Sequence, residues 1–420
     1  MKATRGYKTE LDLNNEQRTA CLKHAGCARF AYNWGLSRAI AAYRATGKRP
    51  TAIDLHRDLN TLKKTDFPWM YEVSKCAMQE ALRDLDNAYK HFFRRLKLKK
   101  EGKLKGKVGF PVFKKKSKGI ASFRLTGSIH VFSDRVQLPR LGRLRLKEHD
   151  YLPTDAKVLS ATVSEEAGRW FVSVQVEEEM SSPGEHLKGG TAAPAIGIDL
   201  GIKTLATLSD GTTFENPRAS KQAHKRLRRL ERQKSRRKKG SQNRKKTCHK
   251  LAKQHARVAH IRCDATHKLT THLVKHHALV AIEDLHVSGM LKNHKLAQAV
   301  ADSNFGEIRR QLTYKAAFHG TYLVVIDRFY PSSKTCSACG YIKAELALQE
   351  RTYICEACGM RLDRDQNAAL NLLHEALRCT ASSAGTYACG QSSSGRLTGA
   401  GETALDEAGT NHRLGSVLNV

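Results

Sequence analysis

Two CxxC pairs separated by fifteen residues constrain the fold of this chain more tightly than any other local pattern. They lie in the stretch CSACGYIKAELALQERTYICEAC and comprise Cys336, Cys339, Cys355 and Cys358. Two thiolate pairs at this separation can close a tetrahedral four-sulfur site, the geometry of structural Zn²⁺, although four thiolates also suit an iron–sulfur centre. So short a segment buries too little apolar surface to fold alone, so the metal would supply its folding free energy. We expect one structural zinc ion here, without a catalytic role, because a closed four-ligand site leaves no open position.

The charge of the chain indicates its partner. The 420 residues include 73 Lys and Arg against 40 Asp and Glu, a formal net charge of +33. Such self-repulsion favours a polyanionic partner, so nucleic acid is the leading candidate and a basic membrane-surface protein is the alternative. The N-terminal MKATRGYKTELDLNNEQ lacks the apolar core of a signal peptide, and no apolar run approaches the roughly 20 residues that span a bilayer. We therefore expect a cytoplasmic, nucleoid-associated protein with reduced cysteines.

Hydrophobic periodicity divides the N-terminal half into a helical part and a strand part. Between about residues 15 and 100, apolar side chains recur at helical spacing, as at Leu82 and Leu85. From about residue 129 to 176 the spacing becomes two, in runs such as WFVSVQV. This pattern predicts an antiparallel β region, a small barrel or sandwich.

Two basic runs are candidate nucleic-acid surfaces, with a solvated charge run as the alternative. Lys90–Lys118 holds thirteen basic residues and the single acid Glu101, with phenylalanines interleaved that offer stacking surfaces. Lys221–Lys253 holds sixteen Lys and Arg and the acid Glu231, ahead of an apolar helical stripe, which predicts one long helix with a basic face. The candidate contacts are Lys97, Lys99, Lys100, Lys114, Lys115, Lys116, Arg226, Arg229, Arg236, Arg237 and Lys238.

Three separated stretches each place an acid at the edge of a core element. Asp199 interrupts the apolar run AIGIDL, Glu283 interrupts ALVAIEDL, and DRDQNAALNLL begins with Asp363 and Asp365. Asp363 suits the N-cap of the helix that follows, which leaves Asp365 in its first turn. Taken singly, such an acid is usually a cap or a paired core carboxylate. Convergent carboxylates, however, bind Mg²⁺, and two such ions about 4 Å apart catalyse phosphodiester hydrolysis.

These stretches resemble the signature blocks of the TnpB (OrfB) family, transposon-encoded proteins similar to type V CRISPR nucleases. The similar blocks are GIDLGIKTLATLSDG, VAIEDLHVSGMLKNHKLAQAVADSNFGEIRRQLTYKA, FYPSSKTCSACG and LDRDQNAALNLL, spread over about residues 195–375. The basic GFPVFKKKSKGIASFRL and the helical N-terminal part match the family more loosely.

The resemblance implies a multidomain α+β protein. It would combine a split RuvC nuclease of RNase H-like fold, a zinc-binding insertion, and an N-terminal wedge β-barrel interrupted by a helical recognition domain. The boundaries are 1–14 for the first barrel strand, 15–105 for the recognition domain, 106–185 for the rest of the barrel, 186–194 for a linker, 195–329 and 359–379 for the nuclease, 330–358 for the insertion, and 380–420 for a disordered tail.

The implied activity is Mg²⁺-dependent cleavage of DNA, guided by an RNA from the transposon's own end and directed beside a short target-adjacent motif. Asp199, Glu283 and Asp365 match the catalytic, magnesium-binding acids, while Arg364 and Asn367 match positions expected to support substrate or acids. In such a protein the guide RNA recognises the target sequence by base pairing, so the protein must bind the RNA and the RNA–DNA duplex through their phosphate backbones. This binding requires excess positive charge, which the chain has. Two alternatives remain: a non-catalytic nucleic-acid-binding regulator of transposition, and an unguided RNase H-like transposase or resolvase.

Overall fold

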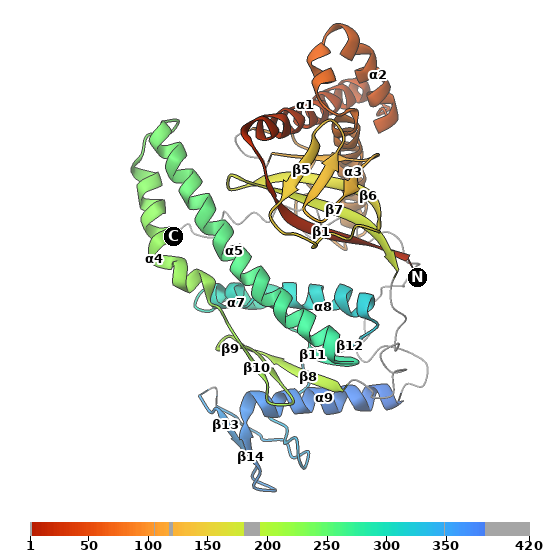
Figure 1. Cartoon of the computed structure of the whole chain (residues 1–420). Helices are drawn as coiled ribbons and strands as arrows, with labels where there is room; N and C mark the ends of the chain where they lie inside the picture. The colour runs from red at the N-terminus through yellow and green to blue at the C-terminus, as the bar shows by residue number, and fades with distance from the viewer. Residues whose placement is uncertain (1, 105, 117–120, 180–193, 348, 383–420) are drawn as a thin grey trace. The chain divides into compact units, whose positions relative to one another are not determined.

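The computed structural model describes residues 2–104, 106–116, 121–179, 194–347 and 349–382. They form two compact units, the N-terminal unit Lys2–Glu179 and the C-terminal unit, which comprises the described residues from 194 onward (Figure 1). Except for residue 194, the predicted linker at 186–194 lies outside the described residues, as do residues 383–420 of the predicted disordered tail. Residues 380–382, predicted to belong to that tail, instead form the end of helix α9. Within the described ranges, none of the helices has the length and apolarity to cross a membrane.

The helices of the N-terminal unit confirm the helical prediction for residues 15–100. They are α1 (Asn15–Thr46), α2 (Ala52–Thr65), the 3₁₀ helix η1 (Pro68–Glu72) and α3 (Lys75–Lys100). Asn14 and Thr51 form capping boxes at the starts of α1 and α2, each accepting a backbone N–H three residues on. Leu36 of α1 and Leu82 of α3 are fully buried in one apolar core that these helices share with the sheet of this unit.

The sheet of the N-terminal unit has seven antiparallel strands. They are β1 (Lys2–Asp12), β2 (Ser122–Leu125), β3 (His130–Val131), β4 (Arg135–Leu138), β5 (Gly142–Leu146), β6 (Lys157–Glu166) and β7 (Arg169–Glu179), in the order β2-β6-β7-β1-β5-β4-β3. The alternation predicted from the sequence is confirmed, because Val172, Val174 and Val176 are all fully buried.

The predicted closed barrel is wrong. Within the described residues, β2 and β3 form the two edges of the sheet and do not pair with each other. Closure requires enough hydrogen-bonding length at both edges, and these strands have only four and two residues. The helices α1 and α3 contact β2 instead.

The C-terminal unit is built on a five-stranded mixed sheet. Its strands are β8 (Ala195–Leu200), β9 (Thr204–Leu208), β10 (Thr213–Glu215), β11 (Leu279–Glu283) and β12 (Tyr322–Ile326), in the order β10-β9-β8-β11-β12. β8 runs antiparallel to β9 and parallel to β11, which runs parallel to β12. The buried strands predicted around Asp199 and Glu283 are thus confirmed, and the predicted SDG turn joins β9 to β10.

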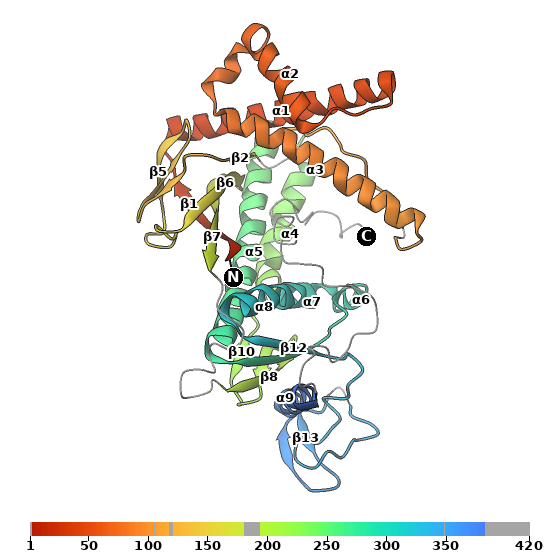
Figure 2. The same ribbon diagram turned by 90° about the vertical axis from the view of Figure 1, so that its right-hand side faces the viewer.

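Helices cover both faces of this sheet (Figure 2). The helices of this unit are α4 (Ala219–Arg236), α5 (Gln242–His276), α6 (Val287–Met290), α7 (Ala297–Ser303), α8 (Phe305–His319) and α9 (Arg364–Ser382), and a small hairpin of β13 (Thr352–Ile354) and β14 (Arg361–Asp363) precedes α9. Ile198 and Ile282 pack with Leu273 of α5 and Leu312 of α8. Ala281 points to the opposite face and packs with α9. Because both faces are covered, the central strands β8 and β11 are apolar apart from Asp199 and Glu283.

The single long helix predicted across the second basic run is wrong. The chain forms two helices, α4 and α5, which lie side by side in Figures 1 and 2; we call them the basic hairpin. The break follows from Gly240, which adopts a φ of 89°, and from Ser241, whose hydroxyl accepts the backbone N–H of Arg244 and caps α5. The Arg237 side chain donates to the Asn243 carbonyl at 2.5 Å, which ties the turn together.

We expect Gly197→Ala to separate α9 from β8. A Cβ on Gly197 would lie 2.0 Å from the Ala369 carbonyl oxygen and 2.8 Å from the Leu373 backbone nitrogen, and backbone atoms cannot swing aside as side chains do. Overpacking of this kind costs about 1–3 kcal/mol or more of unfolding free energy. Unfolding in denaturant measures this loss of unfolding free energy. Gly306→Ala on α8 is the matched control, because its Cβ would meet nothing within 4 Å, and the change should stabilise the helix by about 0.5–1 kcal/mol. Equal stabilities of the two variants would contradict this packing.

Candidate active site and metal centre

Asp199 and Glu283 stand at the carboxyl ends of two neighbouring parallel strands. β8 and β11 are in register, with Ile198 opposite Ile282, so the residues that follow lie at the same level of the sheet. Side chains alternate between faces along a strand, and Gly197, two residues before Asp199, packs against α9. Both carboxyl groups therefore project to the face that α9 covers.

Asp365 reaches the same corner from the first turn of α9. Ala369, Leu372 and Ala376, which follow Asp365 at helical spacing, are buried on the sheet side of α9. Burial raises the pKa of Asp199 to about 7, and the nearby charges of Asp365 and then Glu283 add to this rise. The pKa of Glu283 is raised as well, chiefly by burial. The structure thus brings these three acids together at one end of the sheet, where Asp365 and Glu283 both disfavour ionisation of Asp199.

Asp363 has a different role from Asp365. Its Oδ1 accepts the backbone N–H groups of Asp365 at 2.9 Å and of Gln366 at 3.1 Å, so it caps α9. The cap predicted from the sequence is confirmed.

No local sequence pattern indicates the two ion pairs that form at the residue after Glu283. The next residue, Asp284, forms ion pairs with Arg309 of α8 and with Arg328, which follows β12. Burial opposes ionisation of Asp284, but hydrogen bonds from Arg328 and Arg309 outweigh it and lower the pKa of this carboxyl group. Two guanidinium groups are therefore fixed at Asp284, the residue that follows Glu283 in the chain. Arg309 and Arg328 lie 25 and 44 positions from Asp284 in the chain, too far for a local pattern to reveal the pairing.

We expect the acidic corner to make unfolding depend on pH. A carboxyl group with a folded-state pKa near 7 is protonated in the native chain at pH 5–6, while in the unfolded chain, with a pKa near 3.8, it is ionised. The native state then binds more protons, so stability falls as pH rises from about 4 to about 7, by roughly 1 kcal/mol per pH unit. Thermal unfolding without added divalent cations measures this slope, and Asp199→Asn should reduce it. Identical slopes in the two proteins would show that Asp199 is not the titrating group.

The four cysteines converge as the sequence predicts. Cys336 Sγ lies 3.7 Å from Cys358 Sγ, and Cys339 Sγ lies 3.6 Å from Cys355 Sγ. A tetrahedral zinc site with bonds of about 2.3 Å has sulfur–sulfur distances of roughly 3.8 Å, so the spacing fits zinc. Backbone N–H groups of Cys358 and Ala357 point at the Cys355 sulfur and lower the pKa of that thiol to about 6, which favours a thiolate ligand.

The two candidate metal sites differ in how close their ligand atoms lie to one another. Among the residues that the structure describes, the four cysteines are the only group of three or more His, Cys, Asp or Glu side chains whose ligand atoms already converge, all within 4.8 Å of one another. The carboxyl groups of Asp199, Glu283 and Asp365 interact electrostatically without forming so tight a cluster.

Arg364 and Asn367 face the cysteine segment. The guanidinium of Arg364 donates to the carbonyl oxygens of Ala347 and Glu350, at 3.2 and 3.3 Å. Its positive charge also favours ionisation of Asp199, against the larger effect of burial. The amide of Asn367 is fully buried and binds backbone groups beside Cys336.

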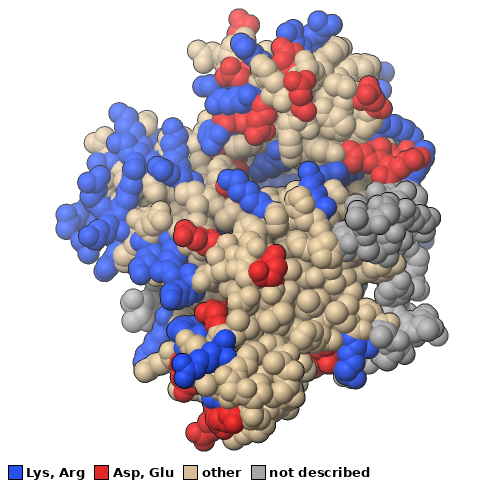
Figure 3. Space-filling model, turned by 60° about the horizontal axis from the view of Figure 1, so that its bottom comes forward, with Lys and Arg blue, Asp and Glu red and all other residues tan. Residues whose placement is uncertain are grey.

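Most candidate nucleic-acid contacts are exposed. Lys and Arg side chains crowd one side of the surface in Figure 3, at the position of the basic hairpin in Figure 1. The exposed members are Lys97, Lys99, Lys100, Lys114, Lys115, Lys116, Arg226, Arg229, Arg236 and Lys238. Two members differ: Arg237 bonds within the hairpin turn, and the Lys114 ammonium lies 4.1 Å from the centroid of the Tyr32 ring. Lys114 is exposed as a residue, but its ammonium end lies inward against Tyr32, where burial lowers its pKa.

The interleaved aromatic side chains of the first basic run pack on one another. Phe92 contacts Phe93 and Phe110 edge-on, with ring centroids 5.2 and 5.3 Å apart. Phe93 and Phe110 still expose about half of their surface, 53% and 47%. This cluster offers apolar area beside the lysines at the end of α3.

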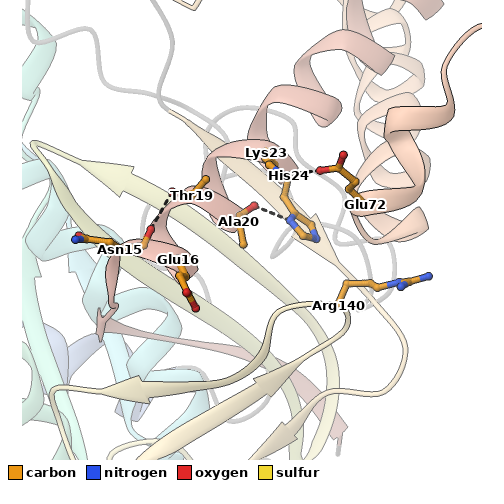
Figure 4. Close-up of a pocket in the computed structure, with 8 residues that line it drawn as sticks. All are labelled: Asn15, Glu16, Thr19, Ala20, Lys23, His24, Glu72 and Arg140. Atoms are coloured by element: carbon orange, nitrogen blue, oxygen red, sulfur yellow. Dashed lines mark hydrogen bonds and ion pairs between the residues drawn. The ribbon is translucent and has the colours of Figure 1, made fainter.

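A hollow of about 420 Å³ in the N-terminal unit has no comparable chemistry (Figure 4). Lys23, Glu72 and His24, which line it, already bond to one another or to the backbone. Lys23 pairs with Glu72 at 2.5 Å, while His24 bonds the Ala20 carbonyl at 2.8 Å and accepts the Ser74 N–H at 3.0 Å. The acidic corner is therefore the stronger candidate for an active site.

Comparisons with known proteins agree with the motifs. A family model described as "Probable transposase" matches residues 171–294, a Cas12f1-like TNB domain model matches 305–372, and a helix-turn-helix domain model matches 1–48. The last region folds as β1 and one continuous helix, α1. A solved structure described as "Cryo-EM structure of the Cas12f1-sgRNA-target DNA complex" aligns with a TM-score of 0.50 at 13% identity, covering 88% of this chain and 98% of that one. The expected mixed α+β fold is thus confirmed at this level.

Relatives in sequence cover nearly the whole chain. Two proteins named "Putative RNA-guided DNA endonuclease" are similar: one from Streptomyces pristinaespiralis, 36% identical over 90% of both chains, and InsQ from Escherichia coli K12, 32% identical over 90% of this chain and 94% of its own. The TnpB-like protein L79 of Acanthamoeba polyphaga mimivirus is 34% identical over 33% of this chain. With this extent of similarity and the signature blocks in place, the protein belongs to the TnpB (OrfB) family.

Proposed function

We propose that the protein is an RNA-guided DNA endonuclease whose active site is the corner formed by Asp199, Glu283 and Asp365. The observation that carries the proposal is the approach of three acids from three separate elements in a chain with a net charge of +33. Holding three carboxyl groups together is costly unless cations neutralise them. The names of the relatives and of the Cas12f1 complex support the same activity.

The sheet supports a RuvC-like nuclease of RNase H type. Three antiparallel strands are followed in the chain by two parallel ones, and the first strand lies at the centre between the second and the fourth. We propose that residues 195–329 and 359–379 form this nuclease, that 330–358 are its zinc-binding insertion, and that the N-terminal unit holds recognition and wedge regions, the wedge being an open sheet.

The acids would hold catalytic Mg²⁺, which, when bound, activates the attacking water and stabilises the leaving oxygen of the phosphodiester. Burial raises the pKa of Asp199 to about 7, so near neutral pH part of the population carries a proton there, and that proton must leave as a cation binds. Arg309 and Arg328, both paired with Asp284, would supply positive charge for a nucleic-acid phosphate at this end of the sheet. The four cysteines would hold one structural zinc ion.

The guide is proposed to be an RNA from the transposon's own end, held by its phosphate backbone. The exposed lysines and arginines at the end of α3 and on the basic hairpin supply the charge for this contact and for the guide–target duplex. Protein contacts would read a short target-adjacent motif. The binding should weaken steeply as salt is raised.

Sequencing of the RNA that co-purifies with the protein tests the guide. The chain is expressed with its flanking transposon DNA, and we expect one defined RNA species. A supercoiled plasmid that carries the matching target is then incubated with the complex and Mg²⁺. Cleavage by RNA-free protein would favour an unguided transposase or resolvase, while RNA binding without any cleavage would favour a regulator of transposition.

A further inference from the structure

Two asparagines on α9 bind the segment that leads into the first CxxC pair. The Asn367 amide donates to the Thr335 carbonyl at 2.7 Å and its oxygen accepts the Ser337 N–H at 3.0 Å. One turn later, the Asn371 amide donates to the carbonyls of Ser332 at 2.8 Å and Thr335 at 2.6 Å. Both asparagines are buried, with exposures of 0% and 2%, so an unmade bond here would leave a polar group without water. We call this pair the asparagine clamp.

The clamp and the acid occupy different sides of one short stretch of helix. Asp365 lies two residues before Asn367, about 200° around the helix, so the acid faces the sheet while the clamp faces the cysteine segment. The sheet side is fixed by the close packing of Ala369 on Gly197. The orientation of Asp365 therefore depends on contacts on both sides of α9.

A second attachment acts on the residues next to Asp365. Arg364 reaches carbonyl oxygens of the loop between the CxxC pairs, and its backbone N–H donates to the Arg351 carbonyl at 2.8 Å. Asp363 ends β14 of this same segment and caps α9. The first turn of α9 is thus continuous with the cysteine segment through covalent and hydrogen-bonded links.

We propose that the four-cysteine site sets the position of Asp365 through the asparagine clamp, so that zinc loading controls how well the acidic corner binds divalent cations. This inference rests on the proposed function, because it takes the corner to be a cation site. Asn367 and Asn371 are positioning residues, since they touch neither the acids nor a substrate. Outer-shell partners of this kind typically change metal affinity by about 10–100-fold.

The test measures Mn²⁺ binding to the full chain without nucleic acid, by the electron paramagnetic resonance signal of free Mn²⁺. We expect Asn367→Leu to raise the dissociation constant about tenfold while the chain retains one zinc ion by elemental analysis. Asn371→Leu provides a second variant in case the first folds poorly, and thermal unfolding reports on folding in both. Leu377→Ala, an exposed change on the same helix, is the matched control and should leave Mn²⁺ binding unchanged.

A double variant tests the route of the coupling. Cys339→Ser should weaken zinc retention and raise the Mn²⁺ dissociation constant by a similar factor. If both changes act through one link, Asn367→Leu should add little in the Cys339→Ser background. Unchanged Mn²⁺ affinity in folded clamp variants, or fully additive effects, would overturn the inference and leave the proposed function standing. Mn²⁺ binding that Asp199→Ala does not weaken would instead overturn the acidic cation site and the proposed function with it.

Discussion

Asp199→Ala should abolish DNA cleavage while the protein still binds RNA and target DNA. The Asp199 side chain interacts electrostatically with both Asp365 and Glu283 in the acidic corner, and its loss removes a proposed ligand of the catalytic cations. We expect the cleavage rate to fall by about a thousandfold or more, which corresponds to roughly 4 kcal/mol of lost transition-state stabilisation. Single-turnover cleavage with saturating guide and Mg²⁺ measures the rate, and a gel-shift assay measures binding.

Asp264→Ala is the matched control for this experiment. It removes the same charge from the same unit, but Asp264 is an exposed residue of α5 that pairs with Lys268 at the surface. Such surface pairs contribute little, so cleavage should be unchanged. Undiminished cutting by Asp199→Ala would show that the active site lies elsewhere.

Loss of the proposed zinc ion should unfold the cysteine segment and leave the five-stranded sheet folded. The apolar cluster of this segment consists of Tyr353 with the partly buried Leu346 and Met360 beside two of the cysteines. So small a core cannot replace the metal, which contributes about 10–16 kcal/mol in isolated zinc-finger peptides. In Cys355→Ser we expect zinc content to fall and limited proteolysis to cut between residues 331 and 362. Cys248→Ser, a cysteine outside the two pairs, should retain zinc and protease resistance. A stable, resistant segment in Cys355→Ser would mean that its fold does not depend on metal.

The cysteine segment and the strand cores could be predicted because their signals are local. The spacing of Cys336, Cys339, Cys355 and Cys358 already limits the backbone to a path that closes a four-sulfur site. The apolar runs of β8 and β11 likewise identify buried strands, and an acid within such a run is unusual enough to be noticed. The cap formed by Asp363 is also local, since it involves the two N–H groups that follow.

Two structural predictions were wrong, each for a physical reason. The long basic helix breaks at Gly240 and Ser241, because a positive φ and an N-cap outweigh the helical preference of the surrounding lysines and arginines. The N-terminal sheet stays open, because β2 and β3 are short and helices contact one of these edges. The inward turn of Lys114 depends on Tyr32, 82 positions earlier.

The sequence alone determined the chemistry of this protein: the charge that favours nucleic acid, the thiols that favour zinc, and the acids set into apolar strands. Only the tertiary structure decided how these groups meet. The register of β8 against β11 places Asp199 level with Glu283, the packing of α9 on Gly197 brings Asp365 to them, and Asp284 collects two arginines from distant elements. The reason is that residue type and spacing act over a few positions, whereas register and helix packing arise from contacts between segments far apart in the chain.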